Sequence, residues 1–420
     1  MSERDPATLR SYRWYGPDSL RAFGHRSRAR QSGLGDGDFH GKPVIGILNT
    51  WTDLNSCHMH FKSTVESIKR GVLQGGGLPM EIPVMSCGET LTKPTSMIYR
   101  NFLAMEAEEM IRANPVDCAV LLGGCDKSTP ALIMGAISAG VPAIYVPSGP
   151  MMKGNWRGQV LGSGSDVWGY WDERRAGNLS EEEWKEIEGG IARSPGHCMT
   201  MGTASTMTAI TEALGLSLPG ASSIPAADSN HIRMSTDVGR RIVEMVWEDL
   251  TPSKIITEKS VDNAVTVAMA MGCSTNAIIH LIAMARRASV NLTMDDLDQK
   301  GREIPLIANI RPSGKDYLME DFFYAGGILA LMHELRDKLN LDEITVSGLS
   351  LRKIISETRT INDDIIRPLD NPIYKEGSLA VLKGNLAPDG CVIKPAACDI
   401  KFFKHKGPAI AVSYTHIRAA

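Results

Sequence analysis

The chain has 420 residues, of which 22% are charged, and a net charge of −3 at pH 7. This length and composition are typical of a globular protein with at least two structural units, and the charge gives no reason to expect nucleic acid or a membrane surface as a partner. No apolar run approaches about 18 residues and the sequence starts without an apolar signal region, so we expect a cytoplasmic protein. Eight cysteines are too few for a disulfide scaffold, which leaves them as core residues, metal ligands or nucleophiles.

The first 40 residues are basic and aromatic in patches and indicate an arm that packs on another part of the molecule. Strand-like and helix-like runs then alternate, in the order "KPVIGILNT", "MHFKSTVESIKRGVLQGGG", "PMEIPVMS", "SMIYRNFLAMEAEEMIRANP", "DCAVLLGG", "TPALIMGAISAG" and "PAIYVPSG". This alternation predicts an α/β fold with a parallel sheet covered by helices. Ligands of such sheets bind beyond the carboxyl ends of the strands.

The later parts of the chain have a different pattern. Residues 151–197 are rich in Gly, Ser, Trp and charge and indicate an excursion, and a mostly helical stretch follows. Farther on, "SLAVLKGNLAPDGCVIKPAA" predicts two strands about a Pro-Asp-Gly turn and the truncated start of a β-rich, barrel-like domain. We therefore expect four segments: an N-terminal arm (1–40), a large α/β domain (41–375), the start of the β-rich domain (376–410) and a tail of non-native sequence (411–420).

Three cysteines fall where a predicted strand ends or a predicted helix begins: Cys57 in "LNSCHMH", Cys125 in "GGCDKSTPA" and Cys198 in "GHCMTMGTAST". A helix N-terminus stabilises a thiolate, which favours metal binding or reactivity, although core packing is the commoner role of a single free cysteine. No CxxC pair supports a structural zinc site or a ferredoxin-type loop.

The other cysteines have weaker claims to a site. Cys87, in "SCGET", is a fourth candidate because it lies near the end of the second predicted strand. Cys118 lies inside a predicted strand and Cys273 inside a predicted helix, where each is a small buried hydrophobe. Polar residues in "GCSTNAIIHLIAMA" indicate a buried polar contact between helices.

Two carboxylates, Glu89 and Asp126, come just after predicted strand ends and could bind a hard cation such as Mg²⁺. Their alternative roles are helix capping and surface charge, and Lys127 would ordinarily be a salt-bridge partner. A P-loop is excluded because Asp126 stands where that motif requires Gly before its Lys. His58 and His60 project from different faces of a helix start, so either one contacts substrate or both serve capping and packing.

Five of these stretches together carry a family resemblance: "LNSCHMH", "GGCDKSTP", "GHCMTMGTASTM", "GCSTNAIIHL" and "SLAVLKGNLAPDGCVIKPAA". From about residue 10 to about residue 410 the chain resembles the family of dihydroxy-acid and sugar-acid dehydratases that includes 6-phosphogluconate dehydratase. The resemblance implies an iron–sulfur cluster on Cys57, Cys125 and Cys198, of the [2Fe–2S] type or alternatively [4Fe–4S]. It also implies Mg²⁺ on Glu89, Asp126 and a carbamylated Lys127. His58 and Thr129 are the predicted substrate contacts.

The implied reaction is that of a hydro-lyase, the loss of water from a 2,3-dihydroxy carboxylate to give a 2-keto-3-deoxy acid. In it, a cluster iron with an open coordination position serves as Lewis acid. The family's base, a serine, and a further Mg²⁺-binding glutamate belong to a region beyond residue 420. The resemblance therefore implies that the chain as written is inactive.

Within the family, "RWYGPDSLRAFGHRSR" and "CHMH" are most similar to pentonate dehydratases, such as those for L-arabinonate or D-xylonate. The first alternative is the dihydroxy-acid dehydratase of branched-chain amino-acid biosynthesis. The second is an iron–sulfur redox or binding protein, which would leave Glu89, Asp126 and Lys127 without a function. The expected partners are a small sugar acid and further copies of the chain in a homodimer or homotetramer.

Overall fold

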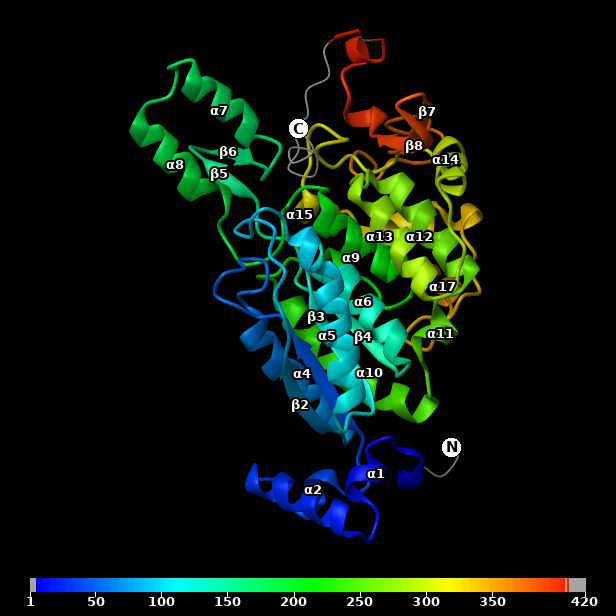
Figure 1. Cartoon of the computed structure of the whole chain (residues 1–420). Coiled ribbons are helices and arrows are strands. Elements are labelled where there is room, and N and C mark those ends of the chain that lie inside the picture. Colours follow the sequence, from blue (N-terminus) through cyan, green and yellow to red (C-terminus); the bar gives the residue numbers. More distant parts are fainter. Residues whose placement is uncertain (1–4, 405, 408–420) are drawn as a thin grey trace.

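The computed structural model describes residues 5–404 and 406–407 (Figure 1), so the predicted tail at 411–420 lies outside the described residues. Its centre is a four-stranded, all-parallel sheet in the order β2-β1-β3-β4. The strands are β1 (Val44–Asn49), β2 (Leu78–Pro83), β3 (Cys118–Gly123) and β4 (Ala143–Pro147). Every residue of β1, β3 and β4 is buried, as expected for strands that are covered on both faces. The predicted α/β fold is confirmed.

Helices cover the two faces of this sheet. On one face, α4 (Phe61–Gly75) contacts β1 and β2, and α10 (Ser229–Glu248) contacts β3 and β4. On the other face, α6 (Ser128–Ala139) contacts β3 and β4 and packs along α5 (Arg100–Ala113). A Cβ on Gly71 of α4 would lie 2.0 Å from a backbone oxygen of α10, and one on Gly239 of α10 would lie 2.2 Å from a backbone oxygen of α4. The two helices therefore touch through their backbones.

The sheet has one topological switch point. The chain runs from β1 outward to β2 and then returns past β1 to reach β3 on its other side. The connections that leave β1 and β3 consequently diverge at their carboxyl ends, and this divergence opens the crevice in which α/β proteins bind ligands. Residues 50–60 and 124–127 fill the connections at this crevice.

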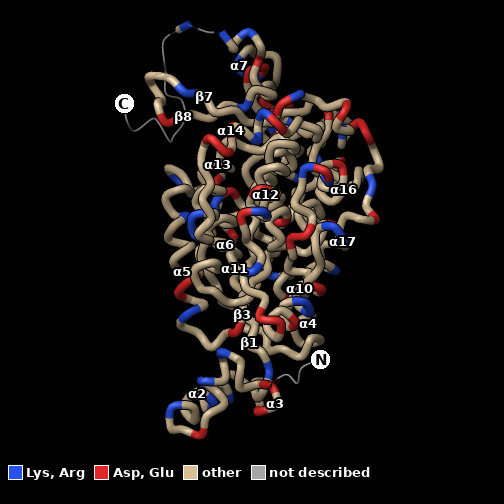
Figure 2. Tube along the Cα trace, turned by 90° about the vertical axis from the view of Figure 1, so that its right-hand side faces the viewer, with Lys and Arg blue, Asp and Glu red and all other residues tan. Residues whose placement is uncertain are grey.

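The remaining helices build on this layer. A second helical group, α9 (Thr203–Ala213), α12 (Glu258–Met271) and α13 (Asn276–Arg287), packs against α6 and against itself. The other helices are α11 (Pro252–Ile255), α14 (Met294–Glu303), α15 (Met319–Tyr324), α16 (Gly327–Glu334) and α17 (Leu351–Ile355). Positive and negative residues are interspersed along the helices in Figure 2, in agreement with the small net charge. Among the described residues, no helix has the length and apolar character needed to cross a membrane.

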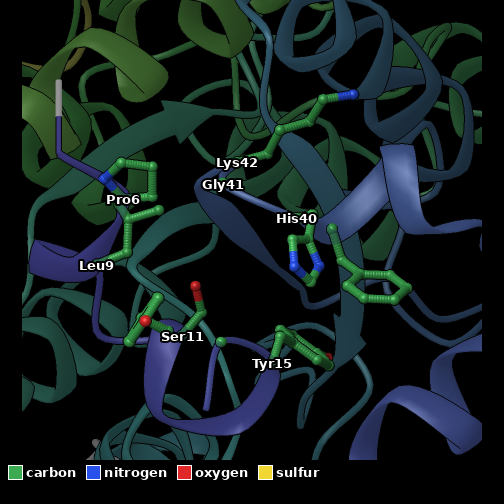
Figure 3. Close-up of a pocket in the computed structure, with 10 residues that line it drawn as sticks. Pro6, Leu9, Ser11, Tyr15, His40, Gly41 and Lys42 are labelled. Atoms are coloured by element: carbon green, nitrogen blue, oxygen red, sulfur yellow. The ribbon is translucent and has the colours of Figure 1, made fainter. Parts of the chain in front are cut away.

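The N-terminal arm lies at the amino ends of the strands and contains α1 (Tyr12–Tyr15), α2 (Leu20–Gln31) and α3 (Asp36–Phe39). Asp117, just before β3, accepts hydrogen bonds from the backbone N–H and the hydroxyl of Ser11, both at 2.7 Å. A cavity of about 260 Å³ separates the arm from the residues that lead into β1 (Figure 3), where the side chains of Tyr15 and His40 face it. This cavity is at the opposite edge of the sheet from the switch point.

The excursion between β4 and α9 projects from the body (Figure 1). It contains the antiparallel pair β5 (Gly154–Trp156) and β6 (Gln159–Leu161), then α7 (Val167–Arg175) and α8 (Glu181–Ile191). It returns next to its starting point, because Pro150 and His197 form a bridge at the carboxyl end of β4. This return places Cys198 at the crevice.

The C-terminal hairpin consists of β7 (Ala380–Gly384) and β8 (Ala387–Ile393), as predicted, but the predicted turn is wrong. The chain turns at residues 385–386, and Pro388, Asp389 and Gly390 lie inside β8. A two-stranded ribbon has free edges, so a proline without an N–H can be accommodated there. Gly390 adopts φ 111°, which few other residues could do. The hairpin packs on α14, where Val381 donates to Asp298 at 2.8 Å.

Candidate active site

Three thiols meet at the switch point. Cys57 follows β1, Cys125 follows β3, and Cys198 is brought in by the excursion. Cys57 and Cys125 share a hydrogen bond, and Cys198 lies close enough to act electrostatically on both. Cys57 and Cys125 are 8% and 3% exposed, whereas Cys198 is exposed to a cavity. The structure thus brings the three predicted cluster ligands together.

The thiols are not activated in the way that the sequence led us to expect. The hydrogen bond that the Cys57 thiol donates to Cys125, followed by burial, raises the pKa of Cys57 well above its usual value. Burial, followed by the charge of Asp126, raises the pKa of Cys198 to about 11. Both residues lie four or five positions before the helices that follow them, which is outside the first turn where a helix terminus acts. Both shifts favour the protonated thiol, whereas a bound metal would favour the thiolate.

A second group converges on one cation. The ammonium of Lys127, a residue only 2% exposed, lies 3.1 Å from Oε2 of Glu89 and 3.4 Å from Oδ2 of Asp126. Burial raises the pKa of Asp126, while Lys127 and a hydrogen bond from the backbone of Ala204 oppose this shift. Glu89 also accepts hydrogen bonds from the hydroxyls of Thr95, at 3.2 Å, and Ser96. The two carboxylates can therefore share a cation.

One residue of each group, Cys198 and Asp126, lines a cavity of about 390 Å³. The rest of its wall includes hydroxyl side chains from three segments and a cation that follows the C-terminal hairpin: Ser163, Ser165, Thr200, Thr203, Ser274, Thr275 and Lys394. Among the described residues, no three His, Cys, Asp or Glu side chains close on a point as the ligands of a single metal ion would. The cavity wall thus contains a soft thiol, a hard carboxylate and several hydroxyl groups.

The two predicted substrate contacts, His58 and Thr129, are fully buried and do not line this cavity. His58 Nε2 lies 3.3 Å from the hydroxyl of Ser128, which accepts a hydrogen bond from the backbone N–H of Cys125 at 3.1 Å. The Thr129 hydroxyl lies 2.7 Å from that of Tyr145, which donates to the carbonyl of Gly123. Both residues brace the loop that follows β3, and their contact with substrate stays a prediction.

The remaining buried cysteines lie as follows. Cys87 is 2% exposed, and burial, followed by the proximity of Cys125, raises its pKa to about 12. Cys118 is fully buried inside β3. The prediction that Cys273 lies inside a helix is wrong, because α12 ends at Met271 and Gly272 turns the chain with φ 83°.

Sequence reasoning missed part of the cavity wall. Ser274 and Thr275 are polar residues in an apolar stretch, which predicts a buried contact between helices. In the structure they occupy the loop between α12 and α13. No local sequence pattern predicts Ser163 or Lys394 as a site residue, since Ser163 comes from the excursion and Lys394 follows the hairpin.

Three buried histidines, His58, His197 and His231, and the partly buried His60 predict an acid-sensitive fold. Burial lowers the pKa of His58 and His197 to about 4, and burial with the neighbouring His231 lowers that of His60 to about 3. The unfolded chain takes up these protons below about pH 6.5, whereas the folded chain does not. Stability is therefore complete above about pH 6.5 and falls with decreasing pH, by about 1.4 kcal/mol per pH unit for each such histidine.

The measurement is the midpoint of urea-induced unfolding, determined at a series of pH values from 8 to 4, in the wild type and in His60→Gln. His60 Nε2 lies 3.0 Å from the Ser148 carbonyl, while its Nδ1 is buried without a partner. A glutamine can donate to that carbonyl but cannot be protonated, so the variant should lose less stability in acid. His40→Gln, at an exposed position, is the control, and its urea midpoint should fall with decreasing pH as steeply as that of the wild type. Equal slopes in all three proteins would contradict the prediction.

Comparison with known proteins agrees with this architecture. Residues 42–354 match the family described as dihydroxy-acid/6-phosphogluconate dehydratase N-terminal, and residues 364–417 match the corresponding C-terminal family. The chain belongs to this family of dehydratases, which confirms the resemblance.

Three relatives with similar sequences are dehydratases of sugar acids or of dihydroxy acids. The chain is 52% identical to the 6-deoxy-6-sulfo-D-gluconate dehydratase of Pseudomonas putida over 96% of its own length and 70% of that protein. It is 45% identical to the L-arabinonate dehydratase of Rhizobium leguminosarum bv. trifolii (strain WSM2304), with the same coverage of both chains. The dihydroxy-acid dehydratase of Methanobrevibacter smithii is 39% identical over 92% of this chain and 71% of that protein. These matches give no support to the expectation that the chain is inactive.

Proposed function

We propose that the chain is a sugar-acid dehydratase, which removes water from a 2,3-dihydroxy carboxylate and leaves a 2-keto-3-deoxy acid. The observation that carries this proposal is the proximity of a thiol set and a carboxylate set at the switch point, with one residue of each, Cys198 and Asp126, in the wall of a polar cavity. The similarity to enzymes that act on 6-deoxy-6-sulfo-D-gluconate and L-arabinonate supports it.

The residues present fit both of the metal groups that the family resemblance implies. Cys57, Cys125 and Cys198 come together from three separate segments at the switch point, and thiolates are the ligands that hold an iron–sulfur cluster. Glu89 and Asp126 each direct a carboxylate oxygen at the ammonium of Lys127, and oxygen ligands of this kind suit Mg²⁺. When bound, the cluster and Mg²⁺ would supply Lewis acidity toward the hydroxyl and carboxylate oxygens of a sugar acid.

Lys127 must change its chemistry to join the oxygen set. An ammonium between two carboxylates would exclude Mg²⁺, whereas addition of CO₂ to the neutral amine, with loss of a proton, gives a carbamate with two further oxygens. Its burial and its two acidic neighbours hold the side chain at the required place. The hydroxyls of Thr200, Thr203 and Ser274 offer hydrogen bonds to the remaining hydroxyl groups of a polyol chain.

The test is anaerobic reconstitution of the 420-residue chain with iron, sulfide and Mg²⁺, followed by assay of keto-acid release. The substrates are L-arabinonate, D-xylonate, 6-deoxy-6-sulfo-D-gluconate and 2,3-dihydroxyisovalerate. We expect turnover of at least one sugar acid, and faster than that of the isovalerate. Turnover of the isovalerate alone would identify a dihydroxy-acid dehydratase. A reducible cluster with no turnover and no Mg²⁺ dependence would indicate the redox protein and reject the proposal.

A further inference from the structure

Lys394 is a cation in the cavity wall to which the proposed chemistry assigns no role. It follows β8 directly and lines the cavity together with Asp126 and Cys198. Its ammonium donates to the carbonyl of Gly272 at 2.8 Å. Among the described residues, no salt bridge includes Lys394, in contrast to Lys383 on the same hairpin, which pairs with Asp295 at 2.5 Å.

The surroundings of Lys394 are those of a binding group rather than a structural ion pair. Gly272 ends α12, so its carbonyl carries part of the negative helix terminus, which attracts the ammonium without neutralising it. An ammonium has three N–H donors, and the carbonyl uses one. Burial lowers the pKa of Lys394, which indicates a charge that is partly desolvated without a carboxylate to compensate. The other two N–H donors can therefore bind a molecule that enters the cavity.

We propose that Lys394 binds an anionic oxygen of the substrate and so makes the cavity selective for acids that carry this charge. The inference rests on the proposed function and deepens it. Two anionic groups have the required chemistry: the carboxylate that every sugar acid carries, and a terminal sulfonate such as that of 6-deoxy-6-sulfo-D-gluconate. Both accept charge-assisted hydrogen bonds from an ammonium. Asp126 and Glu89 cannot take this role, since they are acidic.

The test compares Lys394→Met with the wild type in the reconstituted full chain. Methionine keeps the length and apolar stem of lysine and removes the charge. We expect KM to rise about 10-fold to 100-fold, as for the loss of a charged hydrogen bond, with a smaller change in kcat. An equal rise for L-arabinonate and 6-deoxy-6-sulfo-D-gluconate identifies the carboxylate as the bound group. A rise for the sulfonated acid alone identifies the sulfonate.

Two controls keep the inference separate from the fold and from the proposed function. Lys383→Met removes an exposed lysine of the same hairpin and should leave KM unchanged. Thermal melting with and without each acid reports binding even if no turnover occurs, and the stabilisation seen in the wild type should be lost in Lys394→Met. An unchanged KM in Lys394→Met, a fall in its melting temperature alone, or no stabilisation of the wild type by either acid would overturn the inference. Absence of turnover with intact stabilisation would instead count against the proposed function.

Discussion

Lys127→Arg is expected to lower dehydratase turnover by about 10²-fold to 10³-fold, the usual effect of removing one electrostatic contact to the reacting groups. A guanidinium stays charged at all relevant pH values and cannot form a carbamate. It can still pair with Glu89 and Asp126, which lie 3.1 and 3.4 Å from the lysine nitrogen, so the fold should be retained. The measurements are kcat, the melting temperature, and calorimetric binding of Mg²⁺, which should also be weakened.

The chain offers a matched control for this substitution. Lys69 also bridges two carboxylates, Glu66 at 2.8 Å and Glu81 at 2.9 Å, but it lies on α4, away from the cavity. Lys69→Arg should therefore leave both turnover and Mg²⁺ binding unchanged. Substantial activity in Lys127→Arg would reject the carbamate and leave Lys127 as an ordinary ion-pair partner.

The second large effect concerns the three thiols. Cys57→Ser, Cys125→Ser and Cys198→Ser should each lose most of the iron and visible absorption after anaerobic reconstitution, because a hydroxyl is a poor ligand for the soft iron–sulfur unit. Iron per protein and absorbance are the measurements, and neither requires turnover.

Two other cysteines test whether this loss is specific. Cys391 lies on the hairpin and is exposed, so Cys391→Ser should reconstitute like the wild type. Cys87 lies near Cys125 and is buried within the loop after β2, and Cys87→Ala should retain the iron. If Cys198→Ser bound iron fully and Cys87→Ala lost it, the third cluster ligand would be Cys87 and not Cys198.

The sequence predicted those features that follow from local pattern. Alternating apolar runs and helical spacing located β1, β2, β3 and β4 and their crossovers, and parallel topology then placed Cys57 and Cys125 at a common edge. The start of a predicted helix marks Cys198 as a candidate, but its approach to the other two thiols follows only from the family resemblance, because the long excursion that returns it to β4 has no periodicity that reveals its path.

The features that the sequence did not predict depend on effects that local pattern does not contain. Gly272 could have continued a helix, but it adopts a left-handed conformation that moves Cys273 into a loop. His58, next to a predicted ligand, lies under the loop rather than in the cavity, because its ring stacks on Phe61 at 4.9 Å and is enclosed by hydroxyl groups. Lys394 is far from the other site residues in sequence, and only the docking of the hairpin brings it to the cavity.

The backbone contact between Gly71 and Gly239 also bears on how the chain is made in the cell. On that face of the sheet, α4 and α10 lie side by side, but they are far apart in sequence. Helix α4 ends at Gly75, and α10 begins 154 residues later, at Ser229. At a synthesis rate of about 5–20 residues per second, α10 leaves the ribosome roughly 8–30 s after α4. During that interval the apolar strands β3 and β4 lack the helix that covers them, and the nascent chain exposes surface that attracts other unfolded chains. We therefore expect the first 150 or so residues to depend on chaperones during translation and to form no stable unit until α10 docks.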